Sequence, residues 1–272
     1  MRVCLLASGS KGNSVFVEAG ASRILVDAGL SARELLLRLA AIGVEGEGLD
    51  AILISHEHTD HIRGAGALAR KLKIPLLASH PTCRAGSASI GKTEFIEFES
   101  GCSFTFNDIR IDPFPITHDA SDPVGFIIEC GEGKIGIATD LGIATRLVAE
   151  KLKGCMALVI ESNHDEEMLA NGPYPWHLKQ RIRSRHGHLS NSDSAALLDE
   201  IIHPGLEAVF LAHLSEVNND PVIAFDAATR LVQSRNICSP RLIIGDQYRV
   251  SEMFQLTELK GVPARDRTLQ PS

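Results

Sequence analysis

Four side chains that can bind metal ions fall within six consecutive positions of this sequence. They are His56, His58, Asp60 and His61. Imidazole and carboxylate groups are the ligands that hold borderline divalent metals such as zinc and manganese. Because unpaired polar groups are costly to bury, packing alone does not explain such a group directly after the apolar run at 49–54. The spacing predicts a metal site where a buried strand ends.

Three further candidate ligands each follow an apolar, strand-like segment elsewhere in the chain. They are His118, Asp140 and His213. Ligands at strand ends are held rigidly by the sheets behind them, as a metal site requires. In the loop at 55–61, called the histidine loop below, His56 and His58 can face one metal, and Asp60 and His61 can face another. The three distant residues would then complete the coordination.

The HxHxDH motif at 56–61, followed in order by the three distant candidates, resembles the metallo-β-lactamase superfamily. The resemblance covers nearly the whole chain. It implies an α/β protein with a four-layer αββα sandwich, the metallo-β-lactamase fold. It also implies two divalent metal ions, zinc or manganese, with iron as another candidate, and a metal-bridging hydroxide as the nucleophile.

The same resemblance assigns the ligands. One metal would be bound by His56, His58 and His118, the second by Asp60, His61 and His213, with Asp140 bridging both. Asp60 is also counted among the catalytic residues. Asp27 ends a strand-like run at 24–26 and would orient a ligand histidine from behind.

The superfamily fold does not fix the substrate, because its members cleave β-lactams, thioesters, lactones and phosphodiesters. His188, in the segment 187–191, resembles the histidine near the scissile phosphate in tRNase Z-like phosphodiesterases. This resemblance implies that His188 protonates the leaving alcohol or donates a hydrogen bond to a phosphate oxygen. Glu161, at the end of another apolar run, would orient it. Both residues are predicted to be catalytic.

A basic stretch stands out in a chain whose formal net charge is −7. It comprises Lys179, Arg181, Arg183 and Arg185. Contacts of arginine and lysine with phosphates dominate the affinity of proteins for nucleic acids. A solvated helix face explains some of these residues, and at least one is expected to contact phosphate.

Three polar residues are weaker candidates for phosphate contacts. They are Ser10, Asn13 and Asn191. A purely structural turn explains the first two equally well. Trp176 could stack on a base, but the only tryptophan of the chain is expected to be packed.

Four longer segments resemble the YycJ (WalJ) group of exonuclease-like metallohydrolases. They are residues 6–14, 117–126, 161–165 and 172–176 leading to 188–191. The resemblance implies a metal-dependent phosphodiesterase, specifically a 5′-to-3′ exonuclease acting on DNA, with no β-CASP insertion.

Three alternatives remain open at the level of the sequence. One is a different phosphodiesterase, either an RNase or an enzyme for small, for example cyclic, diesters. The net acidity favours a small substrate, whereas the basic stretch favours a polymer. Another is a glyoxalase-II-like thioester or lactone hydrolase. The last is a non-catalytic, metal-stabilised binding module, against which the complete set of seven ligands argues. Neither the oligomeric state nor the native metal can be predicted.

The elements that must position these residues alternate between strands and helices. Strands are predicted at 3–7, 14–18, 23–27, 50–54, 74–78, 93–98, 103–106, 109–114, 124–129, 134–138, 157–161, 208–212 and 241–244. Helices are predicted at 35–39, 64–72, 144–152, 165–170, 175–184, 190–202 and 221–233. This order favours two packed sheets with helices outside.

The chain is predicted to form one domain over 1–258, followed by a frayed polar tail at 259–272 with two prolines. No apolar run approaches the roughly 20 residues that a membrane helix needs. The apolar part of the N-terminus is too short for a secretory signal. We therefore expect a cytoplasmic protein without a membrane partner.

Overall fold

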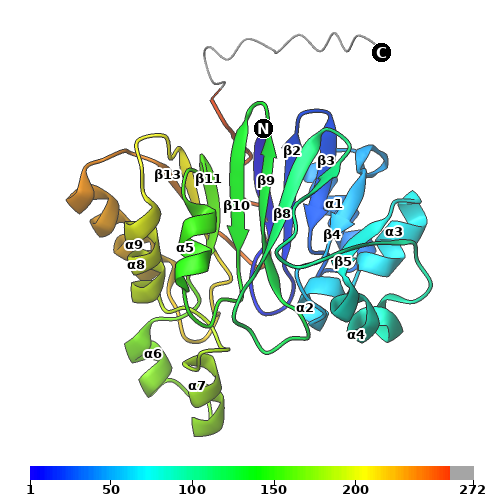
Figure 1. Ribbon diagram of the computed structural model, residues 1–272. Coiled ribbons are helices and arrows are strands. Elements are labelled where there is room, and N and C mark those ends of the chain that lie inside the picture. Colours follow the sequence, from blue (N-terminus) through cyan, green and yellow to red (C-terminus); the bar gives the residue numbers. More distant parts are fainter. Residues whose placement is uncertain (258–272) are drawn as a thin grey trace.

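Two seven-stranded sheets pack face to face in the computed structural model, which describes residues 1–257 (Figure 1). The first sheet has the order β14 (Phe254–Gln255), β1 (Arg2–Ala7), β2 (Ser14–Ala19), β3 (Ser22–Val26), β4 (Ala51–Leu53), β5 (Leu76–Ser79) and β6 (Phe95–Phe98). Its strands are antiparallel from β14 to β3 and parallel from β3 to β6.

The second sheet has the same mixed character. Its order is β13 (Arg241–Ile244), β12 (Ala208–Ala212), β11 (Ala157–Glu161), β10 (Gly133–Ala138), β9 (Val124–Cys130), β8 (Ile109–Pro115) and β7 (Phe104–Phe106). Strands β10 to β13 are parallel, and β7 to β10 are antiparallel. Parallel strands leave their carboxyl ends at one edge of each sheet, where ligands commonly bind.

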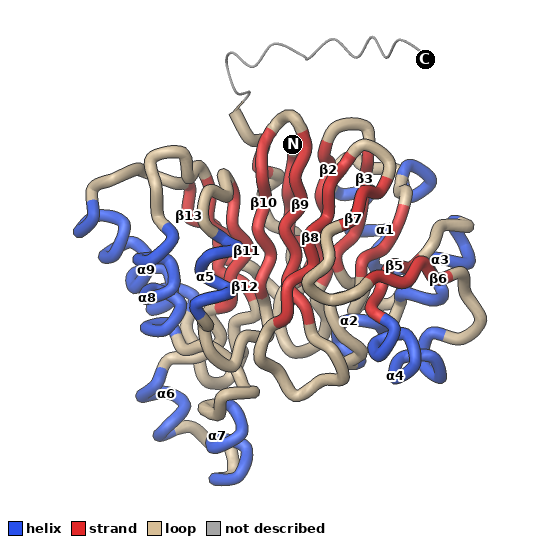
Figure 2. Tube along the Cα trace, in the orientation of Figure 1, coloured by secondary structure: helices blue, strands red, loops and turns tan. Residues whose placement is uncertain are grey.

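Helices cover the outer face of each sheet (Figures 1 and 2). The first sheet is covered by α1 (Ala32–Ala41), α3 (Ala65–Leu72) and α4 (His80–Ile90), and the second by α5 (Arg146–Leu152), α8 (Asn191–Ile201) and α9 (Pro221–Arg235). Shorter helices are η1 (Gly46–Gly48), α2 (Thr59–Ile62), α6 (Glu166–Asn171) and α7 (Trp176–Ile182). The predicted four-layer αββα sandwich is thereby confirmed.

The core explains why the strands read as almost continuously apolar. On β9, Val124, Phe126 and Ile128 point between the sheets, whereas Ile127 points toward the helices. Both faces of each central strand are buried, so both alternating sets of side chains must be apolar. No second domain lies between Asp140 and His213, which agrees with the predicted lack of a β-CASP insertion.

The sequence missed one long helix and overextended another. Helix α4 starts at His80-Pro81, a proline start signal, but its serines and Gly86 hide the apolar period. The helix predicted at 175–184 ends at Ile182, because Ser184 N–H donates to Arg181 O and the chain turns away.

Two other expectations stay predictions. The proposed end of the domain at 258 and the tail at 259–272 lie outside the described residues.

Among residues 1–257, no helix has the length and apolar character needed to cross a membrane.

We expect Phe126→Ala to lower the free energy of unfolding by about 3–5 kcal/mol in urea denaturation. Its ring is fully buried between the sheets, 5.9 Å from the ring of Phe98 between centroids. As a control, Leu37→Ala removes a side chain that is 56% exposed on α1 and should change stability by less than about 0.5 kcal/mol. Equal stabilities of the two variants would contradict the core described above.

Candidate metal centre

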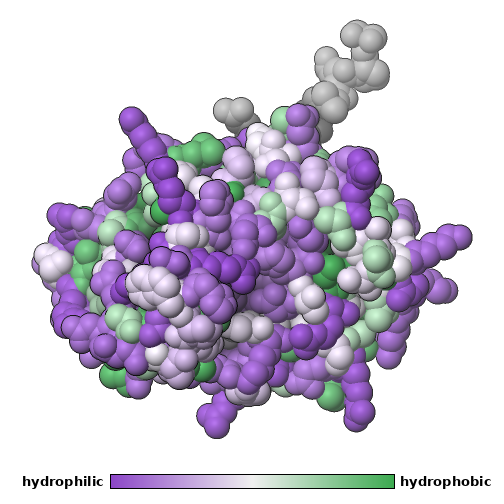
Figure 3. Space-filling view, turned by 90° about the horizontal axis from the view of Figure 1, so that it is seen from below, coloured by the Kyte–Doolittle hydropathy of each residue, from purple (hydrophilic) through white to green (hydrophobic). Residues whose placement is uncertain are grey.

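The predicted metal ligands come together at the edge of the sandwich that carries α2, α6 and α7, at the bottom of Figure 1. Asp27, Glu161 and His213 directly follow or end strands β3, β11 and β12, and the histidine loop follows β4. Figure 3 looks onto this edge, whose surface is largely hydrophilic. The site is therefore assembled from loops that both sheets hold in place.

Three histidines direct one nitrogen each toward a common point. Nε2 of His56 lies 3.1 Å from Nδ1 of His58, which lies 3.3 Å from Nε2 of His118. These atoms belong to the set predicted for the first metal. At these distances the lone pairs of unprotonated nitrogens would repel one another. A cation bound by all three nitrogens would remove this repulsion.

The remaining nitrogen of each of these histidines has a partner that fixes the ring. Nδ1 of His56 lies 3.0 Å from Ser55 Oγ, Nε2 of His58 lies 3.2 Å from Asp119 O, and Nδ1 of His118 lies 3.2 Å from Gly187 O. A carbonyl behind an imidazole makes that nitrogen the donor and leaves the opposite nitrogen free to bind a metal.

The second set surrounds Asp140. Nε2 of His61 lies 3.2 Å from Asp140 Oδ2, and Nδ1 of His213 lies 3.4 Å from Asp140 Oδ1. Asp60 Oδ2 lies 3.8 Å from Nε2 of His213. Asp140 also groups with His56 of the first set, so its carboxylate stands between the two sets, where a bridging ligand must be.

Asp27 fixes the histidine loop through hydrogen bonds to its first and last residues. Its Oδ1 accepts a hydrogen bond from Ser55 N–H at 2.8 Å, and its Oδ2 accepts bonds from Ser55 Oγ and His61 Nδ1, both at 2.7 Å. Asp27 is buried and fixes both the start of the loop and the orientation of a candidate ligand. This geometry is the one expected for a carboxylate that orients a metal-bound histidine.

Glu161 holds two histidines at once. Its Oε1 lies 2.8 Å from Nδ1 of His188 and 2.8 Å from Nδ1 of His213, while its Oε2 accepts bonds from the N–H groups of Leu141 and Leu189. Burial would raise the pKa of this carboxyl, but His188 and His213 lower it to about 2. Since its oxygens are occupied, Glu161 positions other groups. Its contact with His213 was not predicted from the sequence.

Three of the site residues adopt a left-handed backbone. Asp27, Asp140 and His213 have φ values of 62°, 59° and 57°. This conformation is costly for residues other than glycine and persists where the surroundings require it, often at functional sites. The turn aims each side chain back across the strand ends. No local sequence signal predicts it.

Two buried ligand atoms test whether a metal fits. Within residues 1–257, Asp140 Oδ2 and His213 Nε2 are buried without a hydrogen-bond partner. Burial would raise the pKa of Asp140, but His213 and His61 hold it well below its ordinary value. Burial would lower the pKa of His61, yet Asp140 and Asp27 raise it well above its ordinary value. The carboxylate of Asp140 thus stays ionised, and a divalent cation would replace the extra proton that this charge favours on His61, so the residues fit a metal centre.

The basic stretch is only partly available for phosphate. Lys179 Nζ donates to Ala170 O at 2.7 Å, and Arg183 donates to Glu166 O at 3.2 Å. Arg181 forms an ion pair with Asp119, at 2.7 Å, beside the pocket that His188 lines. Arg185 is exposed beyond the end of α7. A phosphate would reach Arg181 and Arg185 most readily.

The weaker candidates for substrate contacts also differ in how accessible they are. Ser10 is exposed and lines the pocket, whereas the buried amide of Asn13 lies 3.1 Å from Nε2 of His61. Asn191 is buried, and its amide bonds to Ser162 and Asn219, so the predicted phosphate contact stays a prediction that would require these bonds to break. Trp176 is 68% exposed, so the expectation that it packs is wrong.

We expect Asp27→Asn to weaken metal binding about 10- to 100-fold, measured by competition with a chromophoric chelator, because His61 loses its charged acceptor. Asparagine tolerates the left-handed backbone at this position.

The matched control for this experiment is Asp108→Asn. Asp108 accepts bonds from Ala21 N–H and Ser22 Oγ at the opposite end of β3 and should leave metal affinity unchanged. Unaltered affinity in Asp27→Asn would contradict the role of Asp27 in fixing the histidine loop.

Comparisons with known proteins agree with the geometry. A family model described as a beta-lactamase superfamily domain matches residues 22–213. The chain is 41% identical over 220 residues to the exodeoxyribonuclease WalJ of Streptococcus pneumoniae serotype 2 (strain D39 / NCTC 7466), covering 79% of this chain and 82% of that protein. It is 38% identical over 237 residues to the exodeoxyribonuclease YycJ of Bacillus anthracis, covering 85% and 89%.

A likeness to solved structures supports the fold. The metallo-beta-lactamase fold protein YhfI from Bacillus subtilis matches with a TM-score of 0.69 at 17% identity, covering 93% of this chain and 99% of that one. The matched family, the two bacterial relatives and the fold agree with the motifs at 56–61 and beyond. The chain therefore belongs to the metallo-β-lactamase superfamily and, within it, to the group that contains WalJ and YycJ.

Proposed function

We propose that this chain is a metal-dependent phosphodiester hydrolase that degrades DNA from an end, in the 5′-to-3′ direction. The observation that carries the proposal is the position of His188 beside the ligand cluster. Its ring lies 5.1 Å from that of His213 and 5.2 Å from that of His118. The names of the two bacterial relatives, both exodeoxyribonucleases, support the same substrate.

The proposed ligand sets are those predicted from the sequence, with zinc or manganese as the metal. When bound, two divalent ions would supply an activated water and stabilise the negative charge that develops on phosphate. Asp27 and Glu161 would hold His61 and His213 in place from behind. The protein thus contributes orientation and fixed charges around the reacting group.

His188 would act on the leaving oxygen. Its Nδ1 is held by Glu161, so Nε2 is the nitrogen left for the substrate in the pocket that this residue lines. A carboxylate behind an imidazole also stabilises the protonated ring. His188 can therefore donate a proton to the departing alkoxide and receive one again from water.

The alternatives differ in substrate. An RNase would use the same residues and contact the same phosphates, so it differs from a DNA exonuclease only in accepting the 2′-hydroxyl group. A small-diester phosphodiesterase would leave the basic groups beyond the pocket without a phosphate partner. A thioester or lactone hydrolase would have no need for His188 backed by Glu161, or for Arg181 at the pocket. These two features favour a phosphodiester over a carbon ester.

We expect His188→Ala to keep its full metal content but lose about 10²- to 10⁴-fold in the rate of hydrolysis of end-labelled DNA, because the leaving oxygen loses its proton donor. His203→Ala is the control, since His203 contacts the backbone of Cys155, and these two residues precede β12 and β11, at the strand ends opposite to His213 and Glu161. DNA hydrolysis at the wild-type rate in the metal-loaded His188→Ala protein would remove this residue from the mechanism.

A polymeric substrate should bind less tightly as salt rises. For single-stranded DNA, the logarithm of the binding constant should fall with the logarithm of salt concentration by about 0.7 for each contacted phosphate. Fluorescence anisotropy of a labelled oligonucleotide with the His188→Ala protein measures this slope.

Arg181→Ala, made in the same His188→Ala background, should reduce the salt slope by about 0.7, the contribution of one contacted phosphate. Arg241→Ala, which breaks an exposed ion pair with Glu252, should not change it. A slope near zero in the His188→Ala protein that keeps Arg181 would favour a small diester instead.

A further inference from the structure

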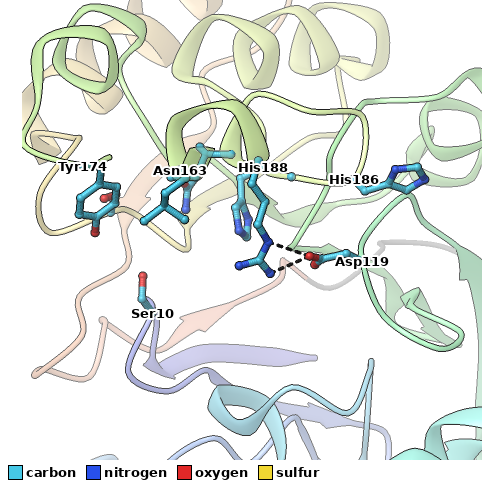
Figure 4. A pocket seen from close by; sticks show the side chains of 11 residues that line it. Ser10, Asp119, Asn163, Tyr174, His186 and His188 are labelled. Atoms are coloured by element: carbon cyan, nitrogen blue, oxygen red, sulfur yellow. Dashed lines mark hydrogen bonds and ion pairs between the residues drawn. The ribbon is translucent and has the colours of Figure 1, made fainter. Parts of the chain in front are cut away.

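A pocket of about 230 Å³ adjoins the metal centre on the side of α7 (Figure 4). It begins at His188 and at Asp119, which directly follows the candidate ligand His118. Its far wall is formed by Tyr174 and by Ser10 of the β1–β2 loop. A group that leaves the metal centre past His188 therefore enters this pocket.

The lining has two chemically different parts. Tyr174, Leu178 and Ile182 contribute an aromatic ring and two aliphatic side chains, the last two from α7. Ser10, Asn163 and Ser215 contribute small polar groups. An aromatic surface joined to polar groups suits a nucleobase, because every base has a flat face to stack and polar atoms at its edge.

Ionisable side chains lie at the end of the pocket nearest the metal centre, where the guanidinium of Arg181 is paired with the carboxylate of Asp119. In Figure 4, His188 lies between Tyr174 and Asp119, and the dashed lines join Asp119 to its arginine partner, Arg181. Arg181 is 57% exposed, so a phosphate can approach it beside Asp119. The pocket therefore has its phosphate-binding groups at one end and its aromatic group at the other.

Tyr174 is held in place by its neighbours. It lies between Pro173 and Pro175, and Pro175 is the N-cap of α7. Proline fixes its own φ and restricts the residue before it, so the backbone at Tyr174 loses little freedom when a ligand binds. Because the backbone is restricted in advance, less binding free energy is lost when Tyr174 stacks on a ligand.

We propose that this pocket binds one unpaired nucleotide, with the base stacked on Tyr174 and the phosphate directed toward His188 and Arg181. The inference rests on the proposed function and adds a substrate requirement to it. A pocket of this volume admits a single base but not a base pair. The nucleotide next to the scissile bond must then be single-stranded when it is cleaved.

Equilibrium dialysis of the metal-loaded full chain tests the pocket, with thymidine 5′-monophosphate and 2-deoxyribose 5-phosphate as the two probes. The wild type should bind the nucleotide about 10-fold or more tightly than the sugar phosphate, because only the nucleotide has a base to stack. Tyr174→Ala should remove this preference and leave the sugar phosphate affinity unchanged. Tyr174→Phe, which keeps the ring, should retain the preference.

Tyr248→Ala is the matched control, because Tyr248 is the other tyrosine of the chain, is 63% exposed and does not line the pocket. An unchanged preference in Tyr174→Ala would overturn the inference even if the wild type degrades DNA. Loss of both probes in Tyr174→Ala and Tyr174→Phe alike would also overturn it. If the wild type fails to degrade DNA but its preference depends on Tyr174, the proposed function fails and the nucleotide pocket stands.

Discussion

The concentration of buried ionisable groups at one edge of the sandwich is the constraint on which the rest of the structure depends. His56, His61, Asp140, Glu161 and His213 are almost completely inaccessible to solvent. Burying such groups without compensation costs several kcal/mol each. Glu161 and Asp27 compensate the imidazoles behind the site, and the nitrogens in front of it converge on the same space. The fold must therefore supply the free energy that keeps these ionisable groups buried together.

Both sheets contribute to that task, and close backbone contacts do the rest. Asn13 N–H donates to Asp60 O at 2.8 Å, which ties the β1–β2 loop to the histidine loop. A Cβ at Gly29 would lie 1.6 Å from the same oxygen, so only glycine allows the loop after β3 to approach. The left-handed turns at Asp140 and His213 then bring carboxylate and imidazole from the second sheet to meet the first.

The sequence predicted the ligand set and the order of the elements because both leave local patterns. The HxHxDH spacing is compact, and apolar runs ended by single polar residues mark where strands deliver ligands. Other features depend on tertiary contacts that no local pattern records. The dual role of Glu161, the pairing of Arg181 with Asp119 and the burial of Asn191 are examples. The prediction that Trp176 is packed is wrong, because composition alone cannot tell an exposed tryptophan from a packed one.

Metal content tests the central claim most directly, namely that the buried cluster is a two-metal centre built around Asp140. Protein reconstituted with zinc or manganese and freed of loose ions can be measured by elemental mass spectrometry, beside an Asp140→Asn variant whose asparagine tolerates the left-handed turn. We predict about two equivalents per wild-type chain, and the loss of at least one in the variant, because the bridging carboxylate charge is gone. One equivalent or none in the wild type, or an unchanged two in the variant, would contradict the account.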